Sequence, residues 1–316
     1  MATACAPPPL WFSVADRHTI RIFGPHAGTS VTLPNVSQLA WGRDGVSLYA
    51  VAGTVENTLY ELRREPATIV AQLPLGGGPS SNIVIDAPAR TLYVGTGTHV
   101  HAFALAPLAP LYSIATCDDH IVALTLFEPG TKAFAACENG ALVEIDTELI
   151  QRQRITPIPD CVPGGVTLNA SETLIVLPCR RSGRIYLLDR VGLTVFDSIE
   201  AGPGLAGFMP EASRRRGVIT RSDGHADYLE IRTGKLTELN LPGAVVGAAQ
   251  TANGPIALII AGVPMELVLA DAHAVAPALS ISGFGTPAAF AAWPTGSPIL
   301  RFLAADPSPP LDAPKP

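Results

Sequence analysis

The segment Thr91-Leu92-Tyr93-Val94-Gly95 decides the fold, because related segments recur along the chain. The recurring anchors are Leu48-Tyr49-Ala50-Val51, Leu92-Tyr93-Val94-Gly95, Phe134-Ala135-Ala136-Cys137, Leu174-Ile175-Val176-Leu177, Val218-Ile219-Thr220-Arg221, Leu258-Ile259-Ile260-Ala261 and Leu300-Arg301-Phe302-Leu303. Their first residues lie 44, 42, 40, 44, 40 and 42 positions apart. A period of about 40–45 residues is typical of a blade of four antiparallel strands. The sequence therefore predicts an all-β fold, a seven-bladed β-propeller in which each anchor is the second strand of a blade.

The two ends of the chain together supply more strands than one blade can hold. Strand-like patterns cover residues 10–14, 19–23 and 30–33 near the start, and 287–293 and 298–303 near the end. We therefore expect N- and C-terminal strands to share one blade and close the ring. Residues 1–9 are expected to be flexible, residues 10–305 to form a single propeller domain, and residues 306–316 to be a disordered, proline-rich tail.

Two units carry a pattern that resembles the seven-bladed propellers of the YVTN-repeat type. In one unit, Gly77-Gly78-Pro79 leads into an apolar strand that is followed by Thr91-Leu92-Tyr93-Val94. In the other, Val162-Pro163-Gly164-Gly165 precedes Thr173-Leu174-Ile175-Val176 and Ile185-Tyr186-Leu187-Leu188-Asp189. The resemblance implies an architecture and no particular chemistry, because one fold hosts many functions.

Charge and hydropathy exclude some classes of partner. The chain carries 21 basic and 27 acidic residues, well mixed, so it lacks the concentrated basic face that nucleic acid requires. No apolar run approaches the roughly 18 residues that span a bilayer. We expect a cytoplasmic monomer without a transmembrane segment; the alternative is an exported protein, periplasmic or lipid-anchored, whose signal peptide has been removed.

Ionisable residues gather at one predicted face of the ring. In a propeller, the loop that leads into each blade (here the incoming loop) and the loop between its second and third strands (the middle loop) lie at the same end. We predict that this face binds ligand through Arg17, His18, His99, Glu138, Arg180, Arg181, Arg221 and Asp223. Candidate catalytic residues at the same face are Asp118, Asp119, His120 and His225.

Four of the five cysteines repeat one placement in two successive units. Cys117 and Cys161 lie in incoming loops, and Cys137 and Cys179 end the second strands. Because the first two strands of a blade are antiparallel, each pair could come within disulfide distance. Three interpretations remain open: two disulfides, reduced thiols, or a zinc site that includes His120, although no Cys-x-x-Cys spacing supports zinc.

The leading functional hypothesis is a binding propeller whose channel mouth holds a small anionic or polar ligand, or a segment of a partner protein. Arginines would supply paired hydrogen bonds to a carboxylate or phosphate. The alternative is a metal-independent enzyme, such as a hydrolase, lactonase, lyase or isomerase, with a histidine as acid or base. No cofactor and no metal site are expected, because the predicted inner strands are almost entirely apolar.

Overall fold

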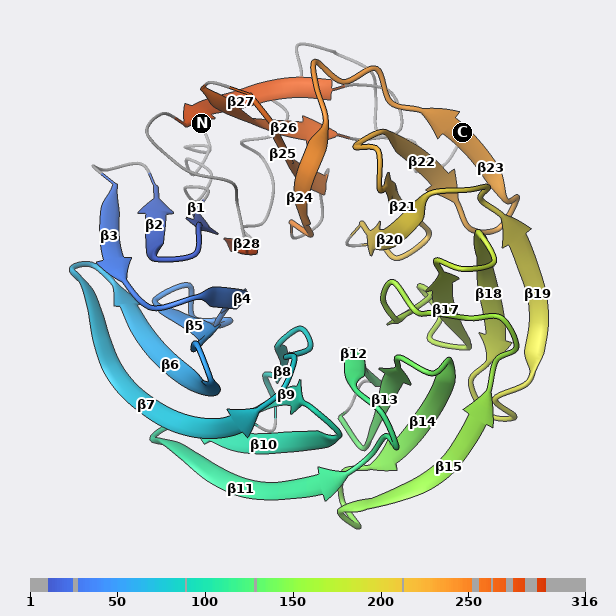
Figure 1. The fold of residues 1–316 in the computed structure, drawn as a ribbon, viewed down its shortest axis with the longest axis horizontal. Helices are drawn as coiled ribbons and strands as arrows, with labels where there is room; N and C mark the ends of the chain where they lie inside the picture. The colour runs from blue at the N-terminus through green and yellow to red at the C-terminus, as the bar shows by residue number, and fades with distance from the viewer. Residues whose placement is uncertain are drawn as a thin grey trace, which may run out of the picture.

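The computed structural model describes residues 11–24, 28–88, 90–127, 130–211, 213–251, 256–262, 264–270, 275–281 and 289–293. In these residues, seven sheets of four antiparallel strands stand in a ring (Figure 1). The predicted all-β, seven-bladed propeller is confirmed. The predicted segments 1–9 and 306–316 lie outside the described residues. The structure describes no helix with the length and apolarity that a bilayer crossing requires.

In blades 2 to 7, four consecutive strands run in chain order from the centre of the ring to its outer edge, whereas blade 1 takes its innermost strand from the end of the described chain. Blade 1 consists of β28 (Ala289–Trp293), β1 (Trp11–Ala15), β2 (Thr19–Phe23) and β3 (Thr29–Thr32). Blade 2 consists of β4 (Val36–Trp41), β5 (Ser47–Ala52), β6 (Glu56–Arg64) and β7 (Ala67–Gly77), and blade 3 of β8 (Val84–Asp86), β9 (Thr91–Thr96), β10 (His99–Leu105) and β11 (Leu108–Ala115). Blade 4 consists of β12 (Ile121–Phe127), β13 (Lys132–Cys137), β14 (Ala141–Asp146) and β15 (Gln151–Pro157), and blade 5 of β16 (Thr167–Leu168), β17 (Leu174–Cys179), β18 (Arg184–Asp189) and β19 (Val195–Glu200). Blade 6 consists of β20 (Leu205–Pro210), β21 (Arg216–Arg221), β22 (Ala226–Glu230) and β23 (Lys235–Glu238), and blade 7 of β24 (Val245–Ala249), β25 (Ile256–Ile260), β26 (Met265–Ala270) and β27 (Val275–Ile281).

Six of the seven anchors lie in the second strands β5, β9, β13, β17, β21 and β25. The predicted position of the seventh anchor was wrong. In blade 1 the second place belongs to β1, whose residues Phe12 to Ala15 pair with β2 on one side and with β28 on the other. The predicted anchor Leu300–Leu303 lies outside the described residues. The first and last strands of the described chain thus share one sheet.

The core is divided among the interfaces between neighbouring blades. Every residue of β9 is buried, as are five of the six residues of β5, because these strands are covered on both faces. One cluster packs Leu59 of blade 2 against Leu92 of blade 3, and another packs Phe134 of blade 4 against Ile175 of blade 5. This double coverage explains why the anchors read as continuous apolar runs rather than as alternating patterns.

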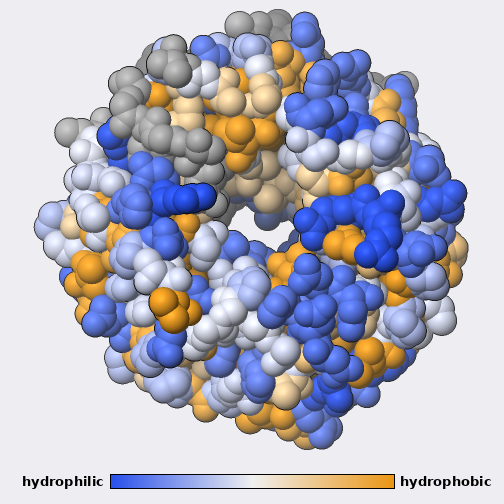
Figure 2. All heavy atoms as spheres, viewed as in Figure 1, coloured by the Kyte–Doolittle hydropathy of each residue, from blue (hydrophilic) through white to orange (hydrophobic). Residues whose placement is uncertain are grey.

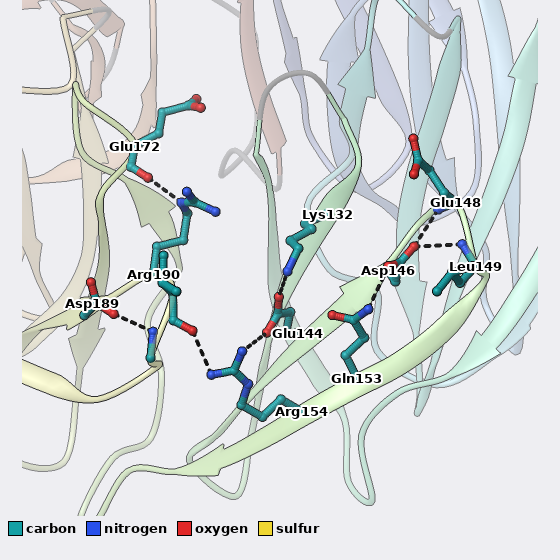
Figure 3. A network of polar contacts seen from close by, with 12 residues as sticks. Lys132, Glu144, Asp146, Glu148, Leu149, Gln153, Arg154, Glu172, Asp189 and Arg190 are labelled. Atoms are coloured by element: carbon teal, nitrogen blue, oxygen red, sulfur yellow. Dashed lines mark hydrogen bonds and ion pairs between the residues drawn. The ribbon is translucent and has the colours of Figure 1, made fainter.

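A network of ion pairs in blade 4 and a hydrogen bond to blade 5 lies away from the predicted binding face (Figure 3). The side chain of Glu144, on β14, is only 1% exposed. It forms ion pairs with Lys132 and with Arg154, whose Nη2 lies 3.0 Å from Glu144 Oε2. Arg154 also donates to the carbonyl oxygen of Val191 in blade 5 at 2.8 Å. A buried carboxylate held by two cations therefore joins the edge of one blade to the next.

Candidate functional site

The incoming and middle loops meet at one face of the ring through backbone hydrogen bonds. The Ile121 N–H, at the start of blade 4, donates to the Gly97 carbonyl in the middle loop of blade 3 at 2.8 Å. The Val245 N–H, at the start of blade 7, donates to the Gly224 carbonyl in the middle loop of blade 6, also at 2.8 Å. Figure 2 shows the ring with an open centre and with strongly hydrophilic side chains beside the opening on the side of β17.

His120 lies at the end of the incoming loop of blade 4, beside two carboxylates. One imidazole nitrogen of His120, one oxygen of Asp119 and one oxygen of Glu138 all lie within 4.8 Å of one another. The Glu138 N–H donates to the His120 carbonyl at 2.8 Å, and the His120 N–H donates to Asp119 Oδ1 at 2.7 Å. His120 Nδ1 is buried and has no hydrogen-bond partner among the described residues. The structure thus brings together two candidate catalytic residues, Asp119 and His120, and one predicted ligand-binding residue, Glu138.

Asp118 does not join this group. Its side chain is 83% exposed, and its Oδ1 lies 3.6 Å from Nη1 of Arg152, on the outer strand β15. Arg152 also donates to the Thr116 carbonyl at 3.2 Å. Of the two aspartates predicted to position His120, the structure therefore places Asp119 beside the imidazole and turns Asp118 toward the rim.

Two disulfides fasten the loops of this face. Cys117 is bonded to Cys137 with a Cα–Cα distance of 5.8 Å, and Cys161 is bonded to Cys179 with a Cα–Cα distance of 4.8 Å. Each bond joins an incoming loop to the end of the second strand of the same blade, and all four residues are buried. With these sulfurs bonded in pairs, the thiolate zinc site left open by the sequence has no free thiols.

Arg180 and Arg181 follow the second disulfide directly, in the middle loop of blade 5. The Arg180 N–H donates to the Val162 carbonyl at 2.8 Å, and the Gly183 N–H donates to the Cys179 carbonyl at 3.0 Å, so the backbone of the loop is held on both sides. Both arginine side chains are exposed, and neither guanidinium makes a hydrogen bond or ion pair with a described residue. The loop therefore presents two adjacent cations to solvent from a fixed backbone.

Arg221 was predicted to bind ligand, but the structure commits its guanidinium to the fold. Its Nε donates to Asp227 Oδ2 at 2.8 Å, and Nη2 forms a second bond to the same oxygen. Nη1 donates to the Pro203 carbonyl at 2.9 Å, and Nη2 to the Ala201 carbonyl at 2.8 Å. Four of the five N–H groups of this guanidinium are occupied. Arg221 thus fastens the incoming loop of blade 6 to β22.

His225 lies apart from His120, because blade 5 separates their blades in the ring. It lines a groove of about 530 Å³ that is formed by residues 223–226 and 238–244. His225 Nδ1 lies 3.9 Å from Glu238 Oε1, and the side chains of both residues are mostly exposed. Asp223 accepts the His225 N–H at 3.0 Å, so its carboxylate also shapes the middle loop. The two predicted histidines therefore belong to two separate places on the face.

The remaining predicted ligand residues are exposed in the middle loops of blades 1 and 3. Arg17 and His18 stand between β1 and β2, where the His18 N–H donates to Asp16 Oδ1 at 2.8 Å. His99 begins β10, and its Nδ1 lies 2.9 Å from the Thr98 hydroxyl. Its neighbour His101 is half-buried, and this burial, together with the charge of His99, lowers the pKa of His101.

Sequence reasoning missed Glu238 and Asp227, the acidic partners of two residues that it singled out. Glu238 ends β23 and leads into the incoming loop of blade 7, so the same loop register that placed His225 would have placed it. Asp227 lies on β22, six positions after Arg221. A basic and an acidic residue on neighbouring antiparallel strands are a recognisable cross-strand pair.

Comparisons with known proteins show the fold alone. No protein-family model and no curated protein sequence matches this chain. The hydrazine synthase of Kuenenia stuttgartiensis is similar in structure, with a TM-score of 0.64 and 15% identity over 75% of this chain and 77% of that one. The β-propeller domain of Cps50 (Swd1) from Myceliophteria thermophila gives a TM-score of 0.65 and 14% identity over 79% and 87% of the two chains. At sequence identities this low, the structural similarity shows the β-propeller fold and indicates no shared chemistry.

Proposed function

We propose that this chain is a binding propeller that recognises an anionic group, a carboxylate or phosphate, at the channel mouth through Arg180 and Arg181. The group belongs to a small ligand or to a segment of a partner protein. The observation that supports the proposal is the contrast among Arg180, Arg181 and Arg221. Four of the five N–H groups of the Arg221 guanidinium are occupied, whereas Arg180 and Arg181 are exposed and their guanidiniums make no hydrogen bond or ion pair with described residues.

The fixed backbone of the Arg180 loop favours recognition over simple surface charge. An exposed arginine loses side-chain entropy when it binds, and a preformed loop reduces the additional cost of ordering the backbone. Here the Cys161–Cys179 disulfide and two backbone hydrogen bonds already hold the loop. Two adjacent guanidiniums can then provide paired, charge-assisted hydrogen bonds to one anion.

The disulfides also bear on the compartment. Disulfides persist in oxidising environments and are rare in the reducing cytosol. Two of them in one chain support the exported alternative over the cytoplasmic one, and we include an oxidising compartment in the proposal.

The metal-independent enzyme has less support. That mechanism requires a histidine acid or base together with arginines that stabilise developing negative charge. Arg221 is engaged by Asp227, and Asp118 lies beside Arg152 rather than beside His120. Binding is therefore the function that the described geometry favours.

The test is a panel of small dicarboxylates, tricarboxylates and phosphates, screened by thermal shift and followed by calorimetric titration. We expect the Arg180→Ala/Arg181→Ala protein to lose at least tenfold in affinity for the anions that bind, since each charged hydrogen bond contributes about 1.5–3 kcal/mol. The matched control is Arg215→Ala/Arg232→Ala, which removes two exposed arginines from the opposite loops of blade 6. Equal affinity in both double variants would overturn the proposal.

A further inference from the structure

We propose that Asp119, His120 and Glu138 form a binding site for a divalent cation of the zinc type, and that the Cys117–Cys137 disulfide holds the ligands in place. The site lies in blade 4, whereas the proposed anion contacts lie in blade 5. The inference therefore goes beyond the anion-binding function and does not depend on it.

The donor set matches zinc and related first-row cations. One imidazole nitrogen and two carboxylate oxygens are ligands that such cations accept, whereas Mg²⁺ and Ca²⁺ prefer oxygen alone. Zinc bonds of about 2.0–2.1 Å in tetrahedral geometry place ligand atoms about 3.4 Å apart. The three atoms here lie within 4.8 Å of one another, and the exposed Glu138 side chain makes no hydrogen bond to a described residue. A rotation of Glu138 can close the site and leave a fourth position open to water.

A second observation comes from the imidazole itself. His120 Nδ1 is buried without a hydrogen-bond partner among the described residues. Buried polar atoms in native proteins nearly always have a partner, which can be a protein group, an ordered water or an ion. Coordination through Nδ1 would satisfy this atom. Asp119 Oδ1 accepts the backbone N–H of His120 at 2.7 Å, which restrains the orientation of this carboxylate.

The disulfide joins the two segments that carry the ligands. Cys117 precedes Asp119 by two residues, and Cys137 directly precedes Glu138. Both cysteines are buried, with exposures of 6% and 0%, so the bond is set in the core beneath the site. The backbone bond from Glu138 to the His120 carbonyl reinforces this link at the surface. The separation of the ligands therefore depends on a bond that a reductant can break.

Blade 5 provides an internal comparison. Its disulfide, Cys161–Cys179, joins the same two positions, but the residue after the second cysteine is Arg180 instead of Glu138. Val162 and Pro163 stand where blade 4 has Asp118 and Asp119. A disulfide in this position thus recurs in the fold, and only blade 4 of this pair surrounds it with metal ligands.

The test uses the full-length protein after treatment with EDTA. We expect one equivalent of Zn²⁺ to bind in calorimetry, one equivalent of Co²⁺ to give visible absorption bands, and neither Mg²⁺ nor Ca²⁺ to compete. Glu138→Gln and His120→Gln should each weaken zinc binding by at least about tenfold. The control is Asp223→Asn/His225→Gln, because that pair also combines a histidine with a carboxylate on the same face. Absence of stoichiometric zinc binding, or equal affinity in Glu138→Gln, would overturn the site.

The role of the disulfide is tested separately. Cys117→Ala/Cys137→Ala should lose about tenfold or more in zinc affinity, whereas Cys161→Ala/Cys179→Ala should bind as the parent protein does. Circular dichroism checks whether both variants are folded. If the first variant does not fold, the exposed substitution Glu138→Gln still decides whether the site exists. Unchanged zinc affinity in a folded Cys117→Ala/Cys137→Ala protein would overturn the positioning role.

Discussion

Reduction of the two disulfides should lower the stability of the folded chain by an amount that follows from their spacing. Cys117 and Cys137 are 20 residues apart, and Cys161 and Cys179 are 18 residues apart. In the chain-entropy description, closing a loop of this length stabilises the folded state by about 3 kcal/mol for each disulfide. The pairs lie in different core clusters, one between blades 3 and 4 and the other between blades 4 and 5, so their contributions should add to about 6 kcal/mol.

The assay is urea unfolding of the oxidised protein and of the same protein after reduction, followed by circular dichroism. Each double Cys→Ala variant, measured without reductant, assigns its share. A thiol count on the denatured, unreduced protein should find one reactive thiol, because the two disulfides account for four of the five cysteines and leave Cys5. Coincident unfolding curves before and after reduction, or five reactive thiols, would refute the reasoning.

Three further predictions follow from the polar contacts. Asp227→Asn should destabilise the protein by about 1.5–3 kcal/mol in urea, because it leaves the Arg221 guanidinium without its carboxylate; a loss below about 0.5 kcal/mol would contradict the assigned role. Lys132→Met should lower the free energy of unfolding by about 1–3 kcal/mol, because it leaves the buried Glu144 carboxylate without this cation. Arg184→Met should lower it by less than about 0.5 kcal/mol, because the Arg184–Glu200 pair is exposed, and equal losses in the two variants would contradict this distinction. Burial lowers the pKa of His101 below its ordinary 6.5, so the unfolded chain binds more protons below that pH and stability should fall as the pH drops from 6.5 toward the lower folded value. His101→Gln should flatten this dependence in unfolding curves measured between pH 7 and 5, and an unchanged slope would contradict the assignment.

The fold could be predicted from the sequence because the ring repeats one pattern. Six copies of an apolar second strand set the phase of the repeat. That phase placed one cysteine of each pair before a first strand and the other at the end of the antiparallel second strand, where the two can meet. The seventh anchor was misplaced because the blade that holds both ends of the described chain breaks the order of the repeat: Trp11–Ala15, and not Leu300–Leu303, takes the second place.

The site could be predicted only as far as the loop register reaches. The sequence analysis treated Arg180 and Arg221 alike as middle-loop residues, but Arg221 is the last residue of β21, whereas Arg180 follows the end of β17. What separates them is the Asp227 carboxylate beside Arg221, a choice made by side-chain geometry across neighbouring strands. Likewise, Asp118 lies beside Arg152 whereas Asp119 lies beside His120, and nothing in the order of the two aspartates indicates which one turns inward.

The central claim is that, at this face, Arg221 is structural whereas Arg180 and Arg181 are available to bind an anion. NMR of the arginine Nε–H groups in ¹⁵N-labelled protein, before and after addition of citrate, measures this division directly. We predict a slowly exchanging Arg221 signal that citrate leaves unchanged, and rapidly exchanging Arg180 and Arg181 signals that citrate shifts. A citrate-dependent shift of the Arg221 signal, with the Arg180 and Arg181 signals unmoved, would contradict the account.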